Sequence, residues 1–175
     1  MYEKFLNHLK YEGKRTFPDT ETFYSEMNGK TFGNGIYRLF AKDECDKWTK
    51  IVEESFPKYK GNIEVFGYDW LGRIFATKKT KGTSLLFEPG TGDVFDVPVG
   101  FAEFHDVELV EYYQDCLAAK FFDEWFSKND NYILKSTECV GYKTPLFLNG
   151  DDNITNVEVS DMEVYWELMM PFMQL

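Results

Sequence analysis

The stretch from Gly67 to Pro98, GYDWLGRIFATKKTKGTSLLFEPGTGDVFDVP, decides the fold. Its apolar runs at 84–88 and 93–97 flank Pro89-Gly90-Thr91-Gly92, a composition that favours a tight turn between two returning strands. Further strands are expected upstream at 63–66 and 73–77. The connections between these four strands are too short for parallel crossovers, so the sequence predicts an antiparallel β-meander.

Apolar residues at helical spacing surround this meander. Helices are expected within 1–15, from Pro18-Asp19 onward, from Asp43 to about Ser55, from Asp106 to about Phe126, and from Asp161 onward. Shorter extended segments are expected at 36–40 and 157–159. No repeat or linker divides the chain. We therefore expect one α+β domain over 1–175, with an N-terminal helical region (1–30), a sheet region (31–100) and an acidic helical region (101–175).

Charge is distributed unevenly along the 175 residues, whose net charge is −11. Residues 1–87 carry 15 basic and 12 acidic side chains, whereas residues 88–175 carry 4 basic and 18 acidic ones. The acidic half would repel nucleic acid and anionic lipid, which argues against direct binding to either. It would attract a basic protein. A solvated acidic surface that only maintains solubility is the alternative.

The chain shows no sign of a membrane or export signal. No apolar run approaches the roughly 20 residues that span a bilayer, and the first residues lack a basic-then-apolar signal pattern. A cytoplasmic protein is expected. The cysteines Cys45, Cys116 and Cys139 have no metal-binding spacing, and reduced, mostly buried thiols are expected.

Motifs for catalysis are weak. His105 stands beside Asp106, which allows a tuned imidazole, but a packed or capping histidine is favoured. Gly90-Thr91-Gly92 suits a hairpin turn better than a phosphate loop, since no helix with a Lys-Ser/Thr pair follows. The polar loop 149–153 lacks the ligand pattern of a calcium loop. We expect no catalytic residue, no metal and no cofactor.

Two groups of residues are candidates for binding. Glu108, Glu111 and Asp115 are spaced three and four apart and would share one exposed helix face, and Asp151 and Asp152 lie in the polar loop. The second group is Tyr68, Trp70 and Arg73, which could line an aromatic pocket. Trp70 either packs in the core, which is favoured, or anchors a partner at the surface, and Arg73 could pair with Asp69 or with a partner.

Several blocks of the chain resemble a bacterial protein family in their order and spacing. These blocks are 32–38, 67–98, 104–112, 141–152 and 161–166. They are similar to the GAD-like proteins and to the C-terminal domain of immunity proteins that neutralise DNase toxins of type VI secretion, which are similar in style to the SUKH (SMI/KNR-type) superfamily. The resemblance implies a SUKH-like α+β fold and a protein that binds and blocks a toxin without catalysis.

Three functions follow as hypotheses. The first is an immunity protein that neutralises a cognate toxin, expected to be a basic nuclease, through the acidic surface. The second is a ligand-binding or adaptor module with an aromatic-lined pocket near Trp70. The third is an enzyme that uses His105 with a carboxylate.

Overall fold

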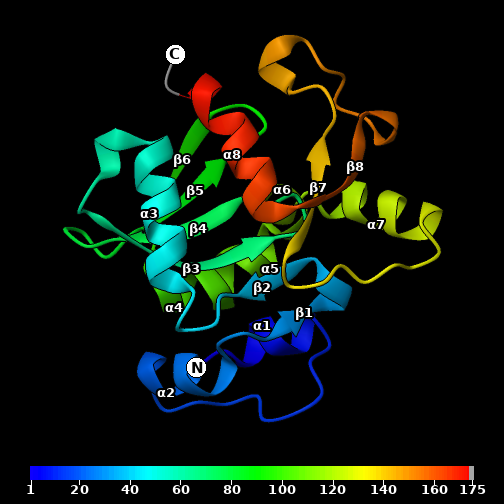
Figure 1. The fold of residues 1–175 in the computed structure, drawn as a ribbon. Coiled ribbons are helices and arrows are strands. Elements are labelled where there is room, and N and C mark those ends of the chain that lie inside the picture. Colours follow the sequence, from blue (N-terminus) through cyan, green and yellow to red (C-terminus); the bar gives the residue numbers. More distant parts are fainter. Residues whose placement is uncertain (174–175) are drawn as a thin grey trace.

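The computed structural model describes residues 1–173 and is built around a six-stranded sheet whose strands follow one another in chain order (Figure 1). All neighbouring strands are antiparallel, which confirms the predicted meander. The strands are β1 (Thr31–Phe32), β2 (Tyr37–Leu39), β3 (Ile63–Asp69), β4 (Ile74–Lys78), β5 (Ser84–Glu88) and β6 (Asp93–Val97). The hairpin predicted at 84–97 has the expected bounds in both strands.

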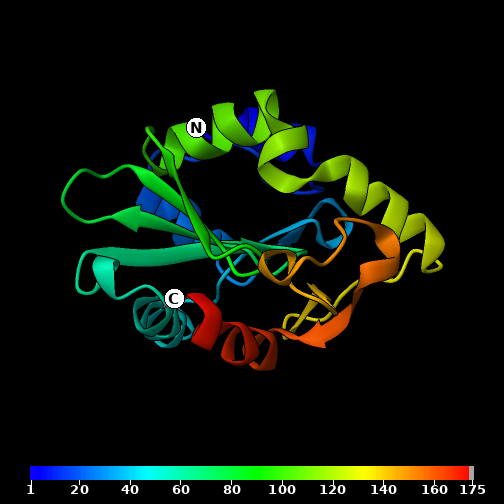
Figure 2. The ribbon, with the colours of Figure 1, turned by 90° about the horizontal axis from the view of Figure 1, so that it is seen from above.

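Both faces of the sheet are largely buried along β2 to β5, and helices cover each of them, whereas the edge strand β6 is mostly exposed. Along β5, Leu86 faces one apolar cluster while Leu85 and Phe87 face the other, as the alternation of side chains in a strand requires. Figure 2 shows α3 and α8 on one side of the sheet and the chain of helices from α4 to α7 on the other. The helices are α1 (Glu3–His8), α2 (Thr20–Met27), α3 (Cys45–Ser55), α4 (Phe101–Glu103), α5 (Leu109–Glu111), α6 (Tyr113–Leu117), α7 (Ala119–Lys128) and α8 (Met162–Met173).

The first residues of three helices show how far the local sequence determines where a helix begins. Asp19 accepts a hydrogen bond from the Thr22 amide at 2.7 Å and caps α2, as predicted. Asp161 accepts from the amides of Glu163 and Val164 and begins α8, also as predicted. Helix α3, in contrast, begins at Cys45 with Glu44 before it, so Asp43 does not cap it.

The long helix expected over 106–126 is not continuous. Residues 104–108 form a π-helical turn, and Ala118 adopts a left-handed conformation with φ 47° that separates α6 from α7. The indole Nε1 of Trp70 donates to the Leu117 carbonyl at 2.9 Å. This carbonyl accepts from a side chain of the turn after β3, and the helix is interrupted at the next residue, Ala118.

The acidic region also contains strands. β7 (Glu138–Tyr142) and β8 (Val157–Asp161) form an antiparallel pair, of which only the 157–159 segment was expected. Gly141 lies against α8, where a Cβ atom would come within 2.6 Å of the Tyr165 ring, so a glycine allows this close packing. Region 101–175 is therefore mixed rather than wholly helical. Over residues 1–173, no helix is both long and apolar enough to cross a bilayer.

Candidate functional site

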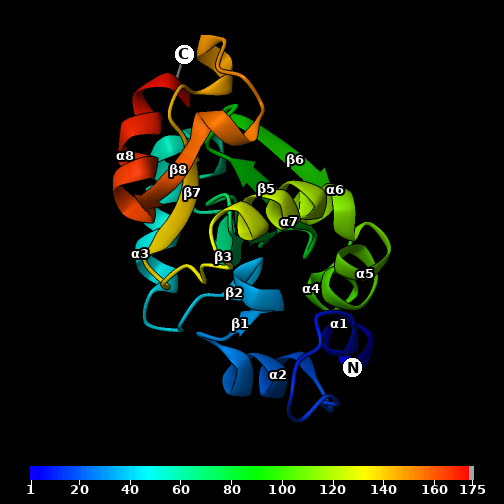
Figure 3. The same cartoon turned by 90° about the vertical axis from the view of Figure 1, so that its right-hand side faces the viewer.

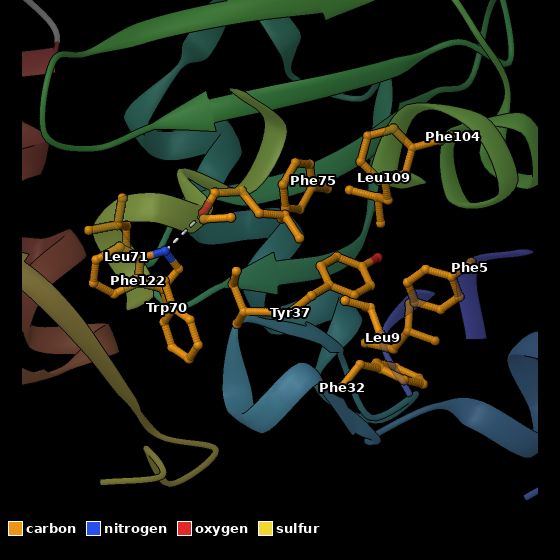
Figure 4. Packing of buried hydrophobic residues seen from close by; sticks show 14 of the residues in the cluster. Phe5, Leu9, Phe32, Tyr37, Trp70, Leu71, Phe75, Phe104, Leu109 and Phe122 are labelled. Carbon is orange, nitrogen blue, oxygen red and sulfur yellow. Dashed lines mark hydrogen bonds between the residues drawn. The ribbon is translucent and has the colours of Figure 1, made fainter. Parts of the chain in front are cut away.

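Trp70 lies in the core. Its side chain is fully buried, and it packs edge-on against Phe121 and Phe122 with ring centroids 5.3 and 5.4 Å away. Figure 4 shows Trp70 beside Leu71 and Phe122, with the hydrogen bond of its indole nitrogen drawn. The favoured core position is confirmed, and the predicted pocket lined by Trp70 is wrong because the Trp70 side chain is enclosed.

Tyr68 is buried as well, within the cluster that faces α3 and α8. Its hydroxyl donates to the Ser136 carbonyl at 2.9 Å, and its ring stacks on Phe40 at 4.5 Å. Tyr68 pairs with Ile74 across the sheet, and both face the same cluster. Arg73 directly precedes Ile74 and therefore points to the opposite face, so Tyr68 does not share a pocket with Arg73. Tyr68 holds the segment before β7 rather than lining an open site.

Arg73 forms a buried ionic cluster, and of its two expected pairings, with Asp69 or with a partner, the structure contains the one with Asp69. The guanidinium lies 2.6 Å from the Asp69 carboxylate and 3.6 Å from that of Glu88, and it donates to the Cys116 carbonyl at 2.9 Å. The other Asp69 oxygen accepts from the backbone amides of Leu71 and Arg73. A buried charge is tolerated when it is paired and hydrogen-bonded in this way.

The turn between β3 and β4 builds this cluster. Gly72 has φ 74°, a left-handed conformation that glycine adopts without steric cost, and its amide closes the turn on the Asp69 carbonyl at 3.0 Å. The turn brings Asp69 and Arg73 together from either side. β4 pairs Ile74 with Phe87 of β5, so one step beyond this pair Arg73 faces Glu88.

The cluster shifts the protonation of its members. Burial raises the pKa of Glu88 to about 7, although the nearby Arg73 opposes the shift. Burial by itself lowers the pKa of Arg73, but the carboxylates of Asp69 and Glu88 prevail and raise it. Glu88 therefore changes charge near neutral pH while Arg73 stays charged.

A cavity of about 440 Å³ opens beside this cluster. Arg73 and Glu88 lie on one side of it, and residues from α7 and from the segment after β7 form the rest. Its lining is Leu71, Arg73, Glu88, Thr91, Ala118, Lys120, Phe121, Glu124, Tyr142, Leu146 and Asp152. Asp69 pairs with Arg73 and Lys128 pairs with Glu124 from outside the lining. The carboxyl groups of Glu88 and Asp152 then face the remaining basic group of the lining, Lys120.

Of the five acidic residues predicted to bind a partner, only Asp152 lines this cavity. Its carboxylate accepts a hydrogen bond from the Tyr142 hydroxyl at 2.7 Å, while Asp151 is exposed in the same loop. Burial raises the pKa of the Cys116 thiol to about 11, and the carboxylates of Glu108 and Asp115 add to the increase. These two carboxylates therefore lie near Cys116, whose carbonyl binds Arg73.

Glu108, Glu111 and Asp115 lie on three successive segments: the π-helical turn, α5 and α6. The single uninterrupted helix that was expected to align them is absent because the chain changes helix type there. Glu111 and Asp115 are exposed, and Glu108 is half-buried.

Sequence reasoning missed Glu88, Glu124 and Tyr142. Glu88 was within reach of prediction, since strands at 73–77 and 84–88 joined as a hairpin place it opposite Arg73. Glu124 and Tyr142 could not be placed, because their positions depend on the break at Ala118 and on the unexpected strand β7.

His105 is a packed histidine, as favoured. It is fully buried, and its ring nitrogens contact the Tyr37 hydroxyl at 2.9 Å and the Phe101 carbonyl at 2.7 Å. Burial lowers its pKa to about 4. The neighbouring Asp106 accepts from the backbone amides of Tyr2 and Phe5 instead, so it holds α1 and does not serve the imidazole.

The three cysteines are free thiols, and only Cys139 is fully enclosed. Within residues 1–173, no three histidine, cysteine or carboxylate side chains come together in a way that could hold a metal ion.

Comparison with known proteins addresses the fold. No family model matches the chain, and no curated protein matches it. Among solved structures, the chain is similar to Atu4351 from Agrobacterium tumefaciens, with a TM-score of 0.68 and 15% identity over 97% of this chain and 88% of that one. At this identity the similarity concerns the fold alone, and the chain has a single-domain α+β fold.

Proposed function

We propose that this protein is a non-catalytic immunity protein that binds and neutralises a cognate toxin through an acidic surface. The toxin class that the family resemblance implies is a basic nuclease. Such an enzyme presents a positive surface for phosphates, which an acidic inhibitor can cover by charge complementarity.

The arrangement of carboxylates around one cavity carries this proposal. Asp152, Glu88 and Glu124 line the cavity. Glu108 and Asp115 lie outside the lining, near Cys116, whose carbonyl accepts a hydrogen bond from Arg73. These residues come from the half of the chain that holds 18 acidic and 4 basic side chains. His105, the candidate for an imidazole-based mechanism, is enclosed by aromatic rings with both ring nitrogens in contact with protein groups.

Affinity capture with the tagged protein, in extract of its own host and at low and high salt, tests the proposal. We expect a nuclease that is retained at low salt and lost at high salt, because salt screens surface charges. The recovered nuclease should lose activity when one equivalent of this protein is added. A nuclease that stays fully active in the complex would contradict the proposal.

Charge reversal tests which residues are involved. Changing Glu108, Glu111 and Asp115 together to lysine should weaken nuclease binding at least about tenfold, as should changing Asp151 and Asp152 together. The matched control reverses Glu12, Glu21 and Asp46, three exposed residues of the less acidic half. Equal weakening in the control would show that net charge, and not this surface, attracts the partner.

The cavity itself favours a second candidate, a ligand-binding or adaptor module. Arg73, Lys120 and Thr91 offer donors to a small polar molecule, and the carboxylates offer acceptors. The expected position of such a pocket moves from Trp70 to this cavity. Thermal-shift screening with polar metabolites should then find a stabilising ligand whose effect is lost in Lys120→Ala and Asp152→Ala.

A further inference from the structure

Helix α8 is apolar on two faces. Its inner face holds Met162, Tyr165, Trp166 and Met169, all of which are buried. Val164, Leu168 and Phe172 follow at intervals of four residues on another face and are 50%, 63% and 40% exposed. A helix that is apolar on all sides is typical of elements covered by protein on every side, and a contiguous exposed apolar surface typically marks an interaction site.

The outer face, which we call the α8 stripe, consists of Val164, Leu168 and Phe172. Its end lies against the segment after β7, because the Phe147 ring is 5.4 Å from that of Phe172. The adjacent Leu148 is 49% exposed and extends the apolar surface. Figures 2 and 3 show α8 at the outer edge of the molecule, with no other element outside it.

Acidic groups flank the α8 stripe. Glu163 and Glu167 lie on one side of it around the helix axis, and Glu163 is paired with Lys47 of α3. Glu167 is exposed, and no ion pair engages it within residues 1–173. A segment lying on the α8 stripe would therefore be attracted if it carried lysine or arginine beside its apolar residues.

We propose that the α8 stripe is a docking surface for an amphipathic helix of a partner protein, with apolar side chains flanked by lysine or arginine. This helix buries Leu168 at its centre and places a basic residue beside Glu167. The inference goes beyond toxin binding at the acidic cavity and uses different residues. The two surfaces are adjacent, because Leu146 lines the cavity while Phe147 contacts Phe172, so one partner can cover both.

Charge argues against a second copy of the chain as the occupant. Antiparallel pairing of two α8 stripes would bring the two Glu167 carboxylates together, on molecules that each carry a net charge of −11. Like charges at an interface disfavour association. A basic helix meets no such repulsion.

The test uses a fluorescent peptide of leucine and lysine, about four turns long, with leucine at amphipathic spacing. We expect saturable binding by fluorescence anisotropy, and at least about tenfold weaker binding of a counterpart with glutamate in place of lysine. Leu168→Ser should weaken binding of the lysine peptide at least about tenfold, and Glu167→Lys about threefold. Because Leu168 is exposed, the variant should fold like the wild type.

The matched control is Ile133→Ser, which removes another exposed apolar side chain (57%) far from α8 in sequence and should change binding less than about twofold. Unchanged binding in Leu168→Ser, or no binding by the wild type, would overturn the proposal. The proposal would also be overturned if sedimentation showed that the wild type is a dimer and that Leu168→Ser dissociates it. The occupant of the α8 stripe would then be a second copy of the chain. The triple lysine variant of Glu108, Glu111 and Asp115 should still bind the peptide, which separates this proposal from the proposed immunity function.

Discussion

His105 and Arg73 are both buried polar groups, yet the structure encloses one and leaves the other beside a cavity. His105 has the Tyr37 hydroxyl and the Phe101 carbonyl as partners, and rings surround it. Arg73 is paired with Asp69 and Glu88, and its cluster borders a cavity of about 440 Å³. The histidine therefore has a structural role, whereas the ionic cluster can respond to a ligand or a partner.

Removal of Arg73 should have the largest effect. Arg73→Met leaves the fully buried Asp69 and the nearby Glu88 without their cation, so we expect unfolding to become easier by about 3–5 kcal/mol at pH 8. The decrease in the free energy of unfolding should become smaller toward pH 5. There Glu88, with its pKa of about 7, takes up a proton and no longer needs a cation. Urea denaturation at both pH values measures this decrease.

The control for Arg73 is Lys78→Met, which breaks the more exposed pair with Asp96. Such pairs contribute up to about 1 kcal/mol. If the two variants lost equal stability, the Arg73 cluster would not be the strongly coupled ionic site that its burial indicates.

His105 should govern stability in acid. Its pKa is about 4 in the folded chain and 6.5 when unperturbed, so the unfolded chain binds the extra proton first. The stability from the neutral imidazole is present above pH 6.5 and is lost as the pH falls toward 4, by about 3 kcal/mol. The stability difference between wild type and His105→Gln, measured in urea at each pH, should shrink by that amount. His8→Gln, at an exposed site, should leave the wild-type profile in place.

Glu88 should show the opposite dependence. Its pKa is raised from 4.5 to about 7, so the folded chain binds the proton more tightly than the unfolded chain. The resulting stability is present below pH 4.5 and is lost as the pH rises through 7, by about 3 kcal/mol. Relative to Glu88→Gln, the wild type should therefore lose stability in urea as the pH rises. A wild type that gains stability relative to this variant would show that Arg73 dominates Glu88.

The sequence predicts one half of this comparison better than the other. The strands at 73–77 and 84–88 follow from local apolar runs and glycine turns, so the pairing of Arg73 with Asp69 and the core position of Trp70 could be inferred. The cavity could not, because its other side depends on the left-handed Ala118 and on β7. Both features arise from tertiary contacts, such as the bond from Trp70 to Leu117, that leave no periodic pattern in the chain.

Asp152 should give the smallest effect and links stability to binding. Asp152→Asn removes the charge but keeps an oxygen that can accept from the Tyr142 hydroxyl, so stability in urea should change by less than about 0.5 kcal/mol. Tyr142→Phe keeps the charge and removes the hydrogen bond, which should cost about 1 kcal/mol. If charge at the cavity attracts the nuclease, only Asp152→Asn should reduce the association rate, and low salt should enlarge that reduction. Equal slowing by both variants would mean that the position of the loop, held by Tyr142, matters more than its charge.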